Sequence, residues 1–293
     1  MSIFLTGSSG FVGQNLRTAI NSKVPIRKYS KGDKITITEN IVIHLAGKAH
    51  DLKKTANFDE YYQINTELTK DVFDAFLLSN AKVFITLSSV KAVADEVEGE
   101  LKETQKPNPV THYGKSKLLA EQYIFSKEIP QGKRVYALRP CMIHGPGNKG
   151  NLNLLYNVVS KGIPWPLGSF ENKRSFCSID NLMFIINELI EREDIPSGIY
   201  NVADDEVIST NELIELIAIS QNRNSKIWHF SRGLIERFAK IGDILHFPIN
   251  TERLHKLTSS YIVNNEMIKN LIGKPFPVSS RDGLLKTFKS FHI

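Results

Sequence analysis

A glycine-rich turn near the start of the chain constrains the fold more than any other feature of the sequence. The short apolar run at 3–6 passes directly into glycines at positions 7, 10 and 13, and a helical pattern follows at 11–20. We interpret Gly7 as permitting a tight turn, Gly10 as letting the backbone approach a pyrophosphate, and Gly13 as allowing close packing of helix on strand. Because a helix N-terminus attracts negative charge, this strand, turn and helix together predict a dinucleotide-binding unit.

Strands and helices alternate over the first half of the 293 residues. Continuous apolar runs at 40–46 and 82–87 are typical of parallel strands that are buried on both faces. Further strands are expected at 24–29, 134–139 and 199–202, and helices at 68–78, 113–125, 152–161, 181–191 and 211–220. We therefore predict an α/β fold, with a doubly wound, Rossmann-type parallel sheet over 1–147. Residues 148–293 are expected to form mainly a smaller α/β substrate lobe, with some chain returning to the first domain.

Composition excludes several classes of protein. Hydrophobic residues make up 41% of the chain and charged residues 23%, which excludes a disordered chain. Two cysteines, Cys141 and Cys177, are too few for a disulfide framework and lack metal-type pairing, so we expect no metal and a reducing compartment. Only Met1 and Ser2 precede the first strand, and no run of about 18 apolar residues occurs. We therefore expect a cytoplasmic protein with no membrane partner.

The formal net charge of +6 is modest and is not gathered into a basic stripe. It is compatible with an anionic substrate and equally with an ordinary solvated surface. We expect no nucleic-acid partner.

Tyr113 and Lys117 form a candidate catalytic pair. They lie four residues apart in a predicted helix and therefore share one face. A lysine ammonium beside a phenol favours the phenolate, so we expect the pKa of Tyr113 to be lowered. The tyrosine would then take a proton from a sugar hydroxyl while hydride leaves the same carbon. Such a spacing is common by chance, but here Ser89 follows the apolar strand at 82–87, at the strand end where open α/β sheets bind ligands.

The ordered set of motifs resembles the extended short-chain dehydrogenase/reductase family, and within it the nucleotide-sugar epimerase/dehydratase group. The matching segments are TGSSGFVG at 6–13, HLAG at 44–47, LSSVKA at 87–92, YGKSK at 113–117, LRPCMIHGPG at 138–147, PWPLGS at 164–169 and KRSFCSIDNL at 173–182. The resemblance covers nearly the whole chain. It implies a catalytic triad of Ser89, Tyr113 and Lys117, a nucleotide-sugar substrate, NAD or NADP as cofactor, and a homodimer formed through two helices.

The resemblance also implies the binding residues. Those expected around the cofactor are Gly7, Gly10, Phe11, Val12, Gly13, Leu45, Ala46, Gly47, Asn65 and Lys117. Those expected to bind the substrate are Ser89, Asn151, Leu167, Gly168 and Arg174. Arg174 would face the nucleotide diphosphate, because a guanidinium fork suits phosphate oxygens.

The sequence departs from the family pattern at three places. Family members that hold NAD often carry an acid at the end of the second strand, but Arg27, Lys28 and Lys31 occur here, which favours NADP. Sugar 4,6-dehydratases place an Asp-Glu pair directly after the serine, where this chain has Val90 and Lys91. Their absence argues against a dehydratase. His144 replaces a tyrosine before Gly-Pro-Gly, and we interpret it as a tolerated loop variant without a catalytic role.

The SSVK sequence at 88–91 resembles a UDP-glucose 4-epimerase-like subgroup. The leading hypothesis is therefore a UDP-hexose 4-epimerase. The alternative is a UDP-4-keto-6-deoxy-sugar reductase in polysaccharide precursor synthesis, since reductases of 4-keto-6-deoxy amino sugars belong to the same subgroup. A dinucleotide sensor without catalytic activity is a third hypothesis, and the presence of all three triad residues argues against it.

Overall fold

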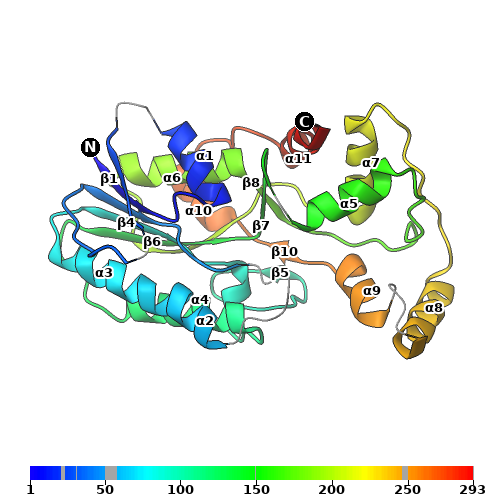
Figure 1. Cartoon of the computed structure of the whole chain (residues 1–293), viewed down its shortest axis with the longest axis horizontal. Helices are drawn as coiled ribbons and strands as arrows, with labels where there is room; N and C mark the ends of the chain where they lie inside the picture. Colours follow the sequence, from blue (N-terminus) through cyan, green and yellow to red (C-terminus); the bar gives the residue numbers. More distant parts are fainter. Residues whose placement is uncertain (21–23, 31, 50–57, 149, 246–249, 293) are drawn as a thin grey trace.

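A six-stranded parallel sheet forms the centre of the molecule (Figure 1). The computed structural model describes residues 1–20, 24–30, 32–49, 58–148, 150–245 and 250–292. The strands lie in the order β2-β1-β3-β4-β6-β9. Their bounds are Ile3–Thr6 for β1, Ile26–Lys28 for β2, Ile41–His44 for β3, Val83–Leu87 for β4, Arg134–Pro140 for β6 and Gly198–Val202 for β9. The strand order reverses between β1 and β3, which confirms the predicted doubly wound α/β fold.

Helices cover both faces of this sheet, and further helices lie in a lobe beside it (Figure 1). Those before β9 are α1 (Phe11–Ala19), α2 (Phe58–Tyr62), the π-helical turn η1 (Gln63–Glu67), α3 (Leu68–Leu78), the short η2 (Val90–Ala92), α4 (His112–Phe125), α5 (Asn151–Ser160) and α6 (Ile179–Glu191). Those after β9 are α7 (Thr210–Ser220), α8 (Arg232–Leu245), α9 (Thr251–Thr258), α10 (Glu266–Ile272), α11 (Ser280–Lys289) and η3 (Ser290–His292).

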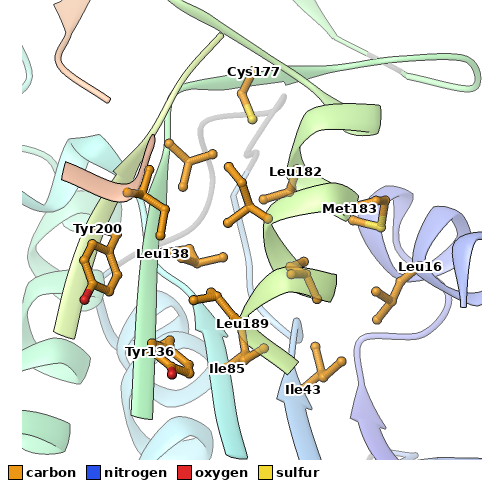
Figure 2. Packing of buried hydrophobic residues seen from close by; sticks show 14 of the residues in the cluster. Leu16, Ile43, Ile85, Tyr136, Leu138, Cys177, Leu182, Met183, Leu189 and Tyr200 are labelled. Atoms are coloured by element: carbon orange, nitrogen blue, oxygen red, sulfur yellow. The ribbon is translucent and has the colours of Figure 1, made fainter. Parts of the chain in front are cut away.

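Alternate residues of each strand enter two separate cores. On one face Ile43 and Ile85 pack with Leu16 of α1 and Leu182 of α6, as Figure 2 shows. On the other face the neighbouring strand residues pack against α3 and α4; these are Phe4, Val42, Phe84 and Val135. Because both faces are buried, the strands need apolar residues at successive positions, which explains the continuous apolar runs.

The second half of the chain contributes to the sheet and also forms a lobe beside it. β9 pairs with β6, with Leu138 opposite Tyr200, and α6 packs on the same face as α1. In the lobe, α5, α7 and α11 share a core around Phe176. Two short parallel pairs connect the parts: β7 (Met142–His144) with β8 (Phe176–Ser178), and β5 (Glu100–Leu101) with β10 (Ile262–Val263).

Two further observations bear on the sequence-based expectations. In the described part of the connection from β2 to β3 the chain forms no helix, so this crossover is shorter than the others. No helix within the described ranges is long and apolar enough to cross a membrane.

Candidate active site

A cleft of about 720 Å³ opens at the carboxyl edge of the sheet, where β1, β3 and β4 end. This volume falls within the range of roughly 300–1,000 Å³ that small-molecule sites occupy. The predicted site residues that line it are Gly7, Gly10, Phe11, Val12, Gly13, Leu45, Gly47, Ser89, Tyr113, Lys117 and Arg174. The fold therefore brings residues from nearly the whole length of the motif series into one cavity.

The three glycines of the turn have different surroundings. Gly7 has a φ of 70°, and a Cβ built on it would lie 2.5 Å from the backbone nitrogen of Ala46. A Cβ on Gly13 would lie 2.3 Å from the carbonyl oxygen of Gly7, so α1 packs directly on the turn. At Gly10, the N-cap of α1, the nearest atom to a built Cβ is that same oxygen at 3.4 Å. Gly10 therefore faces open space at the helix N-terminus, where an anion would bind.

Asn65 holds the loop that follows β3. Its Oδ1 accepts a hydrogen bond from the backbone nitrogen of Lys48 at 2.8 Å, and its Nδ2 donates to the Lys48 carbonyl at 3.0 Å. Nδ2 also donates to Ser116 Oγ of α4 at 2.9 Å. Asn65 is fully buried and does not line the cleft, whereas Gly47 does. These contacts of Asn65 position the loop, and its predicted place beside the cofactor stays a prediction.

Ser89, Tyr113 and Lys117 meet at the end of β4. Ser89 caps η2 by accepting a hydrogen bond from the Lys91 backbone at 3.2 Å, and its side chain is hydrogen-bonded to Tyr113. Lys117 Nζ donates to the carbonyl oxygen of Leu87 at 2.8 Å. Thr111 caps the N-terminus of α4, which fixes the first turn that carries Tyr113. The predicted triad is thus brought together at one point of the cleft.

The prediction that Lys117 lowers the pKa of Tyr113 is wrong for this structure. Burial raises the pKa of Tyr113, and the hydrogen bond from Ser89 opposes that shift only in part. Lys117 is directed to the Leu87 carbonyl, and burial lowers the pKa of its own amine to about 8. Desolvation is therefore the largest influence on the pKa of each group.

An ion pair buried beneath the triad connects α4 to the sheet. Arg139 of β6 donates through Nε to Glu121 Oε1 at 2.8 Å and through a terminal nitrogen to Oε2 at 2.6 Å. The two side chains are 4% and 3% exposed. Glu121 lies one turn after Lys117 and raises the pKa of that amine, against the effect of burial. The pair fixes the helix that carries both Tyr113 and Lys117.

Lys91 and Arg174 bring positive charge to the other end of the cleft. Arg174 donates to the carbonyl oxygens of Ser259 and Lys256, and burial lowers the pKa of its guanidinium. Lys91 Nζ donates to the Asp95 carbonyl at 2.6 Å, and burial lowers its pKa too.

Tyr261 was missed by sequence reasoning. Its ring lies 4.3 Å from Lys91 Nζ, and it lines the cleft from a segment that carries no recognisable motif. Lys91 also lines the cleft, and the motif at 88–91 pointed to its position but not to this contact.

Several predicted binding residues are placed elsewhere. Leu167 is buried in a separate core, and a Cβ on Gly168 would lie 2.6 Å from Ile227. Asn151 is the exposed first residue of α5, and Ala46 donates its backbone hydrogen bond to Thr6. None of these four predicted residues is among the described residues that line the cleft. Their contact with a ligand stays a prediction.

The basic segment that begins in β2 is less basic than its sequence suggests. Arg27 forms a two-point ion pair with Glu39, which is largely buried, and its guanidinium also lies 4.5 Å from the Phe4 ring centre. Its charge is therefore already matched within the protein. Lys31 lies outside the described residues, so the NADP preference stays a prediction.

Two histidines near the cleft are structural. His44 Nδ1 bonds to Thr6 Oγ1 at 2.7 Å and its Nε2 to Thr69 Oγ1 at 2.9 Å, and burial lowers its pKa to about 3. His144 is not a loop residue as we had interpreted it. It belongs to β7, is fully buried, and bonds through Nδ1 to Thr287 at 2.9 Å with Asp204 at 3.4 Å from Nε2.

Comparison with known proteins identifies the class. The NAD dependent epimerase/dehydratase family matches residues 34–203, which is more than half of the chain. The chain belongs to this family. A UDP-glucose 4-epimerase from Vibrio cholerae is 29% identical over 324 residues, covering 99% of this chain and 95% of that protein. A GDP-6-deoxy-D-mannose reductase from Pseudomonas aeruginosa is 26% identical over 240 residues, covering 74% of this chain and 79% of that protein.

A solved structure supports the fold of this epimerase/dehydratase family member. UDP-glucuronic acid 4-epimerase from Bacillus cereus, in complex with NAD, aligns with a TM-score of 0.76 at 17% identity. The alignment covers 100% of this chain and 99% of that one. This likeness confirms the Rossmann-type fold. The match to the family confirms the expected family and enzyme class.

Proposed function

We propose that this family member interconverts the carbon-4 epimers of a UDP-hexose, using NAD or NADP. The observation that carries the proposal is the meeting of Ser89, Tyr113 and Lys117 in a cleft that begins at the glycine turn and ends at Arg174. The likeness to a UDP-glucose 4-epimerase along 99% of the chain supports the same reaction.

The residues present fit a dinucleotide in two respects. Gly10 leaves space above the N-terminus of α1, which suits a pyrophosphate. Ser88 Oγ is buried beside the cleft with no hydrogen-bond partner among the described residues, so it is free to bond a bound ligand. In this proposal the turn at 7–13 holds the pyrophosphate and Lys117 bonds the nicotinamide ribose. The nicotinamide ring supplies a hydride acceptor that also returns the hydride.

The protein's own residues then handle the proton. Ser89 bonds the oxygen on carbon 4 and keeps it beside the Tyr113 hydroxyl. In its phenolate form Tyr113 accepts the proton of the sugar hydroxyl as carbon 4 is oxidised, and returns it when carbon 4 is reduced from its other face. Because burial raises the pKa of Tyr113, the phenolate is the minor form at neutral pH, and turnover should rise as the pH is raised. Arg174 and Lys91 bind the diphosphate end, so that the sugar ring can turn while the nucleotide stays fixed.

A second candidate is a reductase that acts on a UDP-4-keto-6-deoxy sugar. It would use the same three residues once and release oxidised cofactor. The absence of an acid at the end of β2, where Lys28 stands, favours NADP and hence a reductase. The matched charge of Arg27 weakens this argument, and we therefore retain the epimerase as the leading proposal.

The deciding experiment uses the full chain with UDP-glucose or UDP-N-acetylglucosamine and only a catalytic trace of dinucleotide. An epimerase regenerates its own cofactor, so the carbon-4 epimer should accumulate over many turnovers without net oxidation of NADPH or NADH. A matched reaction with Tyr113→Phe should form the epimer at least about 100-fold more slowly. If neither sugar is epimerised, while a UDP-4-keto-6-deoxy sugar consumes reduced cofactor one for one, the reductase replaces the epimerase.

A further inference from the structure

Helix α8 carries two apolar stripes, of which the fold uses one. Ala239 is fully buried, and Ile235 packs with it in the core around Trp165. A second stripe, at spacings of four and three, consists of Leu234, Phe238 and Ile241, whose side chains are 45%, 59% and 46% exposed. Because apolar side chains at this spacing lie in one row on a helix, they form a continuous apolar edge in water.

Two exposed aromatic rings lead into this helix. Trp228 and Phe230 are 52% and 41% exposed, and their ring centres lie 5.8 Å apart. The segment is anchored at its base, because Arg232 donates to the Ser169 carbonyl at 2.8 Å and its guanidinium lies over the Phe170 ring. Figure 1 shows α8 with α9 at the end of the molecule remote from the central sheet.

The charge around the stripe is positive. Arg237 and Lys240 are exposed neighbours of Phe238 and Ile241 on α8. Residues 226–258 contain six Lys or Arg and three Asp or Glu, so this segment carries a net +3 of the +6 of the whole chain. A helix with an apolar row, flanking basic residues and nearby aromatic rings is the pattern of a helix that lies on a membrane surface.

We propose that α8, with Trp228 and Phe230, docks the protein on an anionic phospholipid surface. The apolar stripe would enter the boundary between headgroups and acyl chains, and Arg237 and Lys240 would face the lipid phosphates. This differs from the sequence-based expectation of no membrane partner, which depended on the absence of a spanning segment. A surface helix needs no such segment. The inference is independent of the reaction proposed above.

Charge is also the reason for choosing a membrane over a second copy of the chain. In a two-fold symmetric dimer the same stripe would meet itself, so Arg237 and Lys240 of both copies would lie along one interface. Like charges placed opposite each other oppose such pairing, whereas anionic headgroups attract them. The occupant that matches both the apolar row and its basic edge is therefore the lipid surface.

The test is co-sedimentation of the full chain with vesicles of equal parts phosphatidylglycerol and phosphatidylcholine, and with phosphatidylcholine vesicles alone. Binding is expected on the anionic vesicles and should weaken as salt is raised. Phe238→Asp should reduce the partition coefficient by about tenfold or more, because it puts a charge in place of a ring that would be buried in the membrane. Leu78→Asp is the matched control, since Leu78 is 91% exposed at the end of α3.

Tryptophan fluorescence gives a second readout. The chain has two tryptophans, and Trp165 is already buried, so a blue shift on adding anionic vesicles would report Trp228. Trp228→Phe should remove the shift. The double variant Arg237→Gln, Lys240→Gln keeps the apolar stripe and should lose most of the preference for anionic vesicles. Circular dichroism of each variant checks that the fold is intact.

Three outcomes would overturn the proposal. One is equal binding of wild type and Phe238→Asp to anionic vesicles. Another is the absence of any vesicle binding at low salt. The third is a wild-type dimer that Phe238→Asp dissociates in sedimentation velocity, without vesicle binding, which would assign the stripe to a second copy of the chain.

Discussion

The contrast between Gly10 and Gly13 allows the role of the glycine turn to be tested by two single-methyl substitutions. Gly10 has φ −73° and ψ 169°, which alanine adopts without strain, and the nearest atom to an added methyl group is 3.4 Å away. Alanine is a poorer N-cap than glycine, but it also reduces the entropy of the unfolded chain. We therefore expect Gly10→Ala to change the free energy of unfolding by less than about 1 kcal/mol.

Dinucleotide affinity should respond very differently. The methyl group of Gly10→Ala would occupy the space above the α1 N-terminus, where the pyrophosphate is proposed to lie. Loss of two charge-assisted hydrogen bonds at about 1.5 kcal/mol each gives about 3 kcal/mol, or roughly 100-fold in the dissociation constant. The measurement is calorimetric titration of wild type and variant with NAD and with NADP, alongside urea unfolding without dinucleotide.

Gly13→Ala is the matched comparison. Its methyl group would lie 2.3 Å from the Gly7 oxygen and 2.8 Å from the Ser8 Cα, and backbone atoms cannot move aside cheaply. We expect this variant to lose about 1–3 kcal/mol of stability through overpacking. The reasoning is refuted if Gly10→Ala binds both dinucleotides as tightly as wild type. It is equally refuted if Gly10→Ala is as destabilised as Gly13→Ala.

Three further predictions follow from the site. Tyr113→Phe should cut turnover of whichever sugar proves active by about 100-fold or more and leave dinucleotide affinity unchanged, because it removes only the proton carrier; turnover within a few-fold of wild type would exclude Tyr113 from the mechanism. Arg139→Met should lower the free energy of unfolding in urea by about 3–5 kcal/mol, because it leaves Glu121 buried and unpaired. Adding Glu121→Met to the same chain should restore most of this loss. Equal losses for the single and double variants would show that the charge is not the cause. The pKa of His44 is about 3 in the folded protein and 6.5 in the unfolded chain. The stability that its neutral ring contributes is therefore complete above pH 6.5 and is lost as the pH falls towards 3. Lowering the pH from 6.5 to about 5 should reduce the free energy of unfolding by about 2 kcal/mol. The free energy of unfolding of His44→Asn should depend less steeply on pH over the same range.

The central sheet and the position of the triad could be predicted from the sequence for a physical reason. A parallel strand buried on both faces needs apolar residues in succession, so 40–46 and 82–87 stand out from the rest of the chain. Ser89 then follows from the rule that such strands end at one edge of the sheet. The spacing of Tyr113 and Lys117 is a local property of a helix and needs no tertiary information.

The features that were missed depend on tertiary structure. The pKa of Tyr113 is set by how deeply the cleft buries it, which no local spacing records. Leu167 and Gly168 resemble a binding motif, yet their surroundings are set by residues 227–229, which lie far along the chain. Tyr261 reaches Lys91 because β10 pairs with β5 across more than half the chain. The sequence near Leu167 does not indicate its contact with residues 227–229, and the sequence near Tyr261 does not indicate its contact with Lys91.

The pairing of β9 with β6 bears on how the protein is made. When the ribosome has synthesised the chain only as far as His144, β6 has β4 as its one neighbour. Its other edge, where the backbone of Tyr136 and Leu138 later pairs with β9, remains unpaired. An open edge of this kind invites pairing with other chains. β6 gains its second neighbour only after β9, which ends at Val202, has left the exit tunnel. An expression fragment that ends before β9 should therefore aggregate, although it contains the whole glycine turn and the triad.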